Sequence, residues 1–71
     1  MRVEDAFSIN LKRKLNERGL RPKALARKAD VSLSSIYDAC NGKCVPNLIN
    51  AWKMANGLGV TVDELLRDAT E

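Results

Sequence analysis

Basic side chains are concentrated in one stretch of this 71-residue sequence, between positions 12 and 28. The stretch holds eight lysines and arginines against one acid, a net charge of +7, whereas the whole chain carries +3. Clustered ammonium and guanidinium groups can bind the phosphates of a polyanion without making the whole surface attractive to it. A solvated basic face has the same composition, so charge alone leaves both interpretations open.

The other reactive side chains do not form a catalytic or metal-binding set. Cys40 and Cys44 are the only cysteines, and the sequence contains no histidine. A C-x3-C pair without histidine leaves a tetrahedral zinc site short of ligands, and one disulfide between these two would close a trivially short loop. No glycine-rich phosphate loop and no nucleophile with a recognisably spaced base is present. We therefore expect no enzyme activity, metal, cofactor or small-molecule ligand.

Length and composition favour one small domain. A content of 45% hydrophobic residues argues against a disordered chain, and 71 residues are too few for a multidomain enzyme. No apolar run approaches the roughly 20 residues of a membrane span, and the first residues do not resemble a signal peptide. We expect a single domain over residues 1–71, with its core over 5–67, located in the cytoplasm and not in a membrane.

The elements that position the basic residues are expected to be helices, because apolar residues recur with helical spacing throughout. The first helix carries Val3, Phe7, Leu11 and Leu15 at intervals of four. It ends before Gly19, a residue suited to a left-handed C-terminal cap. No segment alternates long enough for a strand, so the predicted fold class is all-α with five short helices.

The second and third predicted helices are separated by a turn of three residues. The second begins at Pro22, where the missing N–H costs nothing, and the third runs from about 33 to 40 after Ser32 as its N-cap. Asp30 stands where the turn needs a left-handed residue, for which aspartate is a tolerated substitute for glycine. Helix, short turn and helix form a helix-turn-helix unit, predicted over residues 22–41.

Two further helices complete the predicted bundle. The fourth follows Asn47 as its N-cap and is expected to bury Leu48, Trp52 and Ala55, which makes Trp52 a core residue rather than a ligand-stacking one. Gly57 is expected to weaken its last turn by up to about 1 kcal/mol. The fifth opens with Thr61 and Glu64 as a capping box, and Leu65 and Leu66 close the base of the core. The exposed part of the fourth and fifth helices is left available for a two-fold interface.

Residues 19–66 together resemble the lambda-repressor/Cro-like (XRE-type) helix-turn-helix family. The matching elements occur in the family's order and spacing: Leu25-Ala26, Val31-Ser32, Ser34-Ser35-Ile36, Asn41-Gly42-Lys43, Pro46, Leu48, Leu58-Gly59-Val60 and Asp63-Glu64-Leu65-Leu66. The resemblance implies a compact five-helix domain that binds double-stranded DNA as a transcriptional regulator, often as a homodimer. It also implies that the third helix enters the major groove.

The resemblance assigns the DNA contacts to two sets of residues. Base contacts are expected from the outer face of the third helix, at Leu33, Ser34, Tyr37 and Asp38. Phosphate contacts are expected at the start of the second helix and the end of the third, at Arg21, Lys23, Asn41 and Lys43. The family often has a phosphate-gripping glutamine where this chain has Pro22, so Arg21 must compensate by charge. The alternative is that the third helix is only the solvated side of the bundle.

A second departure from the family concerns the pair that often bridges the first and third helices through Arg and Glu. Here both positions are apolar, Leu15 and Cys40, and such a replacement is often neutral or stabilising. We therefore expect Leu15 to contact a buried, inert Cys40, and Cys44 to be exposed in the loop.

The expected function is sequence-specific DNA binding by a regulator, a repressor of phage, prophage or plasmid type. The alternative is a protein-interaction module of antitoxin or antirepressor kind on the same fold, with weak DNA binding or none. Leu33, Tyr37 and Asp38 keep that alternative open, because none of them is a typical DNA-binding cation or amide.

Overall fold

The computed structural model describes residues 2–67, and these contain all five predicted helices and no strand. The helices are α1 (Val3–Arg18), α2 (Pro22–Ala29), α3 (Leu33–Cys40), α4 (Leu48–Leu58) and α5 (Val62–Leu66). The predicted all-α class is confirmed. Residues 1 and 68–71 of the predicted domain lie outside the described residues. None of the helices in the described part of the chain is long and apolar enough to cross a membrane.

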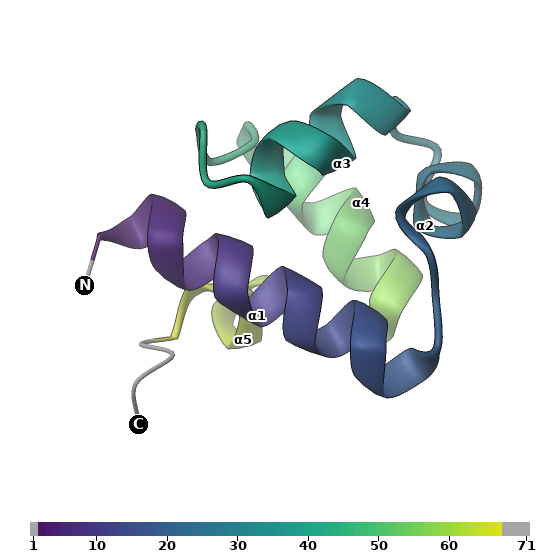
Figure 1. Cartoon of the computed structure of the whole chain (residues 1–71), viewed down its shortest axis with the longest axis horizontal. Coiled ribbons are helices and arrows are strands. Elements are labelled where there is room, and N and C mark those ends of the chain that lie inside the picture. The colour runs from purple at the N-terminus through teal and green to yellow at the C-terminus, as the bar shows by residue number, and fades with distance from the viewer. Residues whose placement is uncertain (1, 68–71) are drawn as a thin grey trace.

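Two sets of contacts build the bundle. α1 packs against α3 and α5, and α2 packs against α4 and α3. Figure 1 shows α1 along the length of the molecule, with α3 above it and α5 below it in this view. One cluster of buried side chains from all five helices fills the space between them.

Helix α1 follows the predicted apolar series except at its first member. Phe7, Leu11 and Leu15 are buried, whereas Val3 is 53% exposed. Val3 is the first helical residue, and burial in α1 begins at Ala6. Gly19 ends the helix in the left-handed region, with φ of +63°, and its N–H donates to the Asn16 carbonyl at 3.2 Å. The predicted cap is therefore confirmed.

The turn between α2 and α3 has the predicted geometry. Asp30 adopts φ of +58°, and among the described residues it is the only one besides glycine with a positive φ. The Val31 N–H donates to the Ala26 carbonyl at 3.0 Å, and the Val31 side chain is buried. The Ser32 hydroxyl then accepts from the Ser35 N–H at 3.2 Å, so α3 begins with the expected N-cap.

The predicted inner face of α4 is wrong. Leu48 and Trp52 are 78% and 58% exposed, and the residues that enter the core are instead Ala51, Met54, Ala55 and Leu58. These four stand at positions i, i+3, i+4 and i+7, the spacing of one helical stripe. Of the three residues predicted to be buried, only Ala55 belongs to that stripe. The Asn47 N-cap is confirmed, because its side-chain oxygen accepts from the Asn50 N–H at 2.8 Å.

Close packing between α2 and α4 accounts for the glycine inside α4. A Cβ at Gly57 would lie 2.9 Å from Leu25 Cδ1 and 3.1 Å from Ala29 Cβ. Gly57 lets the two helices cross without a side chain between them, and its predicted cost in helix propensity stays a prediction.

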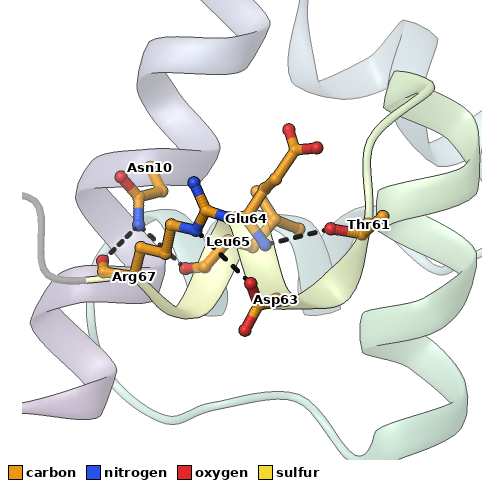
Figure 2. Close-up of polar contacts among 6 residues, drawn as sticks. All are labelled: Asn10, Thr61, Asp63, Glu64, Leu65 and Arg67. Carbon is orange, nitrogen blue, oxygen red and sulfur yellow. Dashed lines mark hydrogen bonds and ion pairs between the residues drawn. The ribbon is translucent and has the colours of Figure 1, made fainter.

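Helix α5 is held to α1 by a buried amide. The Asn10 Nδ2 donates to the carbonyl of Leu65 at 3.0 Å and to that of Arg67 at 2.7 Å (Figure 2). Thr61 caps the helix by accepting from the Glu64 N–H at 3.2 Å, which confirms the predicted start of α5. Leu65 is fully buried, whereas Leu66 is 42% exposed and does not close the core as expected.

Candidate nucleic-acid interface

The start of α2 forms a cationic cleft. Arg21 occupies the N-cap position in extended backbone, with no side-chain hydrogen bond to the helix, and Pro22 is the first helical residue. The cleft has a volume of about 450 Å³ and is lined by Gly19, Arg21, Lys23, Ala24 and Arg27. Arg21 and Lys23 lie at the N-terminus of α2, where the helix dipole and the side-chain charges have the same sign and favour an anion. Arg27 lines the cleft from the last turn of the helix.

Arg27 was not among the predicted phosphate contacts, although it lines the same cleft as Arg21 and Lys23. The sequence does contain a signal for it. Arg27 follows Lys23 by four residues, and residues at that spacing share one face of a helix.

The outer face of α3 is polar and accessible over most of its length. Ser34 and Asn41 are exposed, and Tyr37 is 48% exposed. Leu33 is half-buried and packs against the core, which reduces the apolar area that it can offer to a ligand. Asp38 is also half-buried.

The first turns of α1 hold the end of α3 in place. The Ser8 hydroxyl donates to the carbonyl of Cys40, and Gly42 beyond it adopts φ of +71°. A Cβ at Gly42 would lie 3.7 Å from the Asp5 Oδ1, so a carboxylate lies close to this turn. Lys43 follows and is exposed, and its N–H donates to the Asp38 carbonyl at 3.1 Å. The end of α3 is therefore less cationic than the start of α2.

Another cation lies near the end of α3, contributed by α1. Burial raises the pKa of the Cys40 thiol, and the positive charge of nearby Lys12 opposes that shift. The proximity of Lys12 to α3 depends on how α1 packs, so no local sequence signal predicts it.

Cys40 and Leu15 are both buried in the core cluster, as expected for the apolar replacement of an ion pair, and Cys44 is exposed as predicted.

The eight predicted contact residues fall into two groups in the structure. Arg21 and Lys23 share the cleft at the start of α2. The other six, Leu33, Ser34, Tyr37, Asp38, Asn41 and Lys43, follow α3 and the turn after it. The two groups are joined by the turn between α2 and α3, and these two helices pack against each other. Within residues 2–67 no group of three or more acidic, cysteine or histidine residues could hold a metal ion.

Comparison with known proteins identifies the family. Neither the curated proteins nor the solved structures gave a match to this chain. A family model described as helix-turn-helix matches residues 11–65, which include α2, α3, α4, the second half of α1 and most of α5. This family consists of DNA-binding transcription-regulator domains and not of enzymes. The order of helices, the left-handed turn at Asp30 and the matched range agree, and the chain belongs to the lambda-repressor-like (XRE-type) helix-turn-helix family.

Proposed function

We propose that this domain binds double-stranded DNA sequence-specifically in the cytoplasm and acts as a repressor of phage, prophage or plasmid type. The supporting observation is the combination of an accessible polar face on α3 with a cationic cleft at the start of the helix before it. In a helix-turn-helix domain, the second helix of the unit reads bases in the major groove while flanking groups hold the backbone.

The proposed base contacts differ in what they can read. Ser34 can donate to or accept from either type of base, and the exposed part of Leu33 can contact a thymine methyl group. Tyr37 can reach a base or a phosphate through its hydroxyl, and Asp38 can accept from the amino group of cytosine. Ser34 and Tyr37 are the more accessible pair, so they carry most of the proposed readout.

The proposed phosphate contacts are Arg21 and Lys23 at one end of the interface and Asn41 and Lys43 at the other. Phosphate contacts supply most of the affinity in such complexes. Because the Asp5 carboxylate lies beside the turn that precedes Lys43, we expect Arg21 and Lys23 to contribute more than Lys43. As a homodimer, the protein would contact two half-sites about 34 Å apart.

A titration of labelled duplexes tests this proposal. The protein is added to a mixed pool of duplexes and to duplexes selected from it, at several salt concentrations, and binding is followed by fluorescence anisotropy. The affinity should fall steeply with salt, and Arg21→Ala, Lys23→Ala and Lys43→Ala should each reduce the salt slope by about 1. Arg67→Ala is the matched control. Arg67 is an exposed cation directly after α5 and belongs to neither contact group, so the substitution should leave the salt slope unchanged.

Ser34→Ala separates sequence reading from general affinity. It should relax the preference at one base pair, at a cost of about 1–3 kcal/mol against the preferred site, while binding to the mixed pool changes little. A promoter carrying the selected site, placed before a reporter gene, then tests the sign of regulation, and a repressor lowers its expression.

The alternative is a protein-interaction module, which the half-buried Asp38 and the neighbouring Asp5 favour because both repel phosphates. No binding to any duplex at low salt would support that alternative and contradict the proposed function.

A further inference from the structure

Arg27 extends the cationic cleft of α2 from the first turn of the helix to the last. The cleft is lined by Gly19, Arg21, Lys23, Ala24 and Arg27, a set with three cations and no acid. All three cations are exposed, and none of them forms an ion pair within residues 2–67. Like charges around one hollow repel each other, and an anion between them removes that repulsion. Arg27 therefore adds a third unpaired charge beside the two proposed phosphate contacts.

The neighbouring lysine borders a different hollow of the surface. Lys28 lines a groove between α2 and α4, together with Ala29, Trp52, Lys53, Asn56 and Gly57. Arg27 and Lys28 are both exposed, and both belong to the last turn of α2. Successive residues of an α-helix point in different directions, because 3.6 residues make one turn. The two cations therefore have the same charge at the same level of the helix, but only Arg27 faces the cleft.

We propose that Arg27 is a third phosphate contact, which holds a phosphate one or two nucleotides away from the one held by Lys23 on the same DNA strand. Lys23 and Arg27 are four residues apart, so they share one face of α2 and are separated by about 6 Å along its axis. Successive phosphates of one strand advance by about 3.4 Å along the duplex axis. The separation of the two side chains therefore matches that of nearby phosphates.

The guanidinium of Arg27 is well suited to this contact. Its planar fork has five N–H donors and can form two parallel hydrogen bonds with one phosphate. A phosphate contact carries no sequence information by itself, so Arg27 raises the affinity for all duplexes and leaves the base preference to α3. The inference rests on the proposed function, because it assigns a further residue to the same interface.

The salt dependence of binding by the full chain tests this assignment. Each phosphate contact contributes about 0.9 to the salt slope. When salt is raised from about 50 to 200 mM, the affinity of Arg27→Ala for the mixed pool of duplexes should therefore fall about three- to fourfold less than that of the wild type. Arg27→Lys keeps the charge, so it should keep the slope while binding more weakly at each salt concentration.

Lys28→Ala is the matched control for Arg27→Ala. Both variants remove one exposed cation from the last turn of α2, so the loss of favourable interaction with the helix dipole is the same in both. Lys28→Ala should have the salt slope of the wild type. Circular dichroism of both variants confirms that they fold. Equal slopes in Arg27→Ala and the wild type, or equal losses in Arg27→Ala and Lys28→Ala, contradict the inference.

Duplexes with one neutral phosphate identify the contact itself. A set of selected duplexes, each with one phosphate replaced by an uncharged methylphosphonate, is titrated with the wild type and with Arg27→Ala. At one position the replacement should weaken binding by the wild type but not by Arg27→Ala, because the variant has already lost that contact. Replacements that weaken both proteins equally at every position contradict the inference, since Arg27 then holds no particular phosphate.

The failure of this inference can be distinguished from that of the proposed function. A wild-type chain that binds no duplex at low salt contradicts both. A wild-type chain that binds with the expected salt dependence, which Arg21→Ala reduces and Arg27→Ala does not, contradicts the role of Arg27 alone.

Discussion

Helices α3 and α4 begin in the same way and yet present opposite kinds of surface. Each has an N-cap side chain that accepts from the N–H three residues later, Ser32 for α3 and Asn47 for α4. The outer face of α3 is polar, whereas that of α4 exposes Leu48, Ile49 and Trp52. Identical starts therefore say where a helix begins but nothing about which face it buries.

The difference between the two faces comes from side-chain size. In α3 the aliphatic residues mark the inner face, because Ile36 is fully buried and Leu33 packs against the core, although the larger Tyr37 is 48% exposed. In α4 the largest residue, Trp52, is outside, and the buried stripe contains two alanines besides Met54 and Leu58. Small residues suit this inner face because α2 crosses α4 closely at Gly57. Leu48, Trp52 and Ala55 also have helical spacing, so spacing did not choose between the two stripes of α4, and size was misleading.

The largest expected effect tests the inner face of α4 directly. Met54→Ala should reduce the free energy of unfolding by about 2–5 kcal/mol, because Met54 is fully buried and its removal leaves a cavity. Trp52→Ala should change it by no more than about 0.5 kcal/mol in the monomer. Both values come from denaturant unfolding at concentrations below association. Equal losses in the two variants would mean that the inner face of α4 is wrongly assigned.

Most of the fold could be predicted because its boundaries depend on local chemistry. Pro22, Asp30 and Ser32 each impose a backbone conformation or a cap within a few residues of themselves, and the structure places all three as expected. Val3 and Trp52 were wrongly placed because their burial depends on how far other helices extend over them. Spacing along one helix contains no information about that coverage.

The candidate site was predictable in composition and less so in arrangement. The resemblance to a family supplied the expected contacts on α3 and at the start of α2, and the charge pattern agreed with the latter. The sequence did not reveal the carboxylate of Asp5 beside Gly42 or the approach of Lys12 to Cys40. Both arise from packing of α1 against α3, between residues that are far apart in the chain.

Gly57 tests why small residues line the inner face of α4. Gly57→Ala gains up to about 1 kcal/mol of helix propensity, but its Cβ would overlap Leu25 and approach Ala29. Overpacking of this kind costs about 1–3 kcal/mol, so a net loss of up to about 2 kcal/mol is expected. Thermal and denaturant unfolding measure it. Stabilisation by the full propensity gain would show that α2 and α4 have room to separate.

The two N-caps should contribute equally, despite the different faces of their helices. Ser32→Ala and Asn47→Ala each remove one hydrogen bond to an exposed backbone N–H, and each should cost about 1 kcal/mol. Ser35→Ala is a control for the hydroxyl of Ser35, which lies 2.8 Å from that of Ser32. If Ser35→Ala costs as much as Ser32→Ala, the contact between the two hydroxyls, and not the cap, stabilises the start of α3.

The smallest expected effect concerns the two cysteines, which lie at the end of α3 and in the loop before α4. Cys44 is exposed and Cys40 is buried, so a thiol reagent should modify Cys44 in the native protein and Cys40 only after denaturation.

Because burial raises the pKa of Cys40, the unfolded chain releases the thiol proton at lower pH than the folded one. Stability contributed by the protonated thiol is therefore complete below the ordinary cysteine pKa, about 8.5, and decreases as pH rises above it. Denaturant unfolding of wild type and Cys40→Ala at several alkaline pH values measures this decrease in the free energy of unfolding, and the variant should not show it. Equal pH slopes in both proteins would show that Cys40 ionises as freely in the folded chain as in the unfolded one.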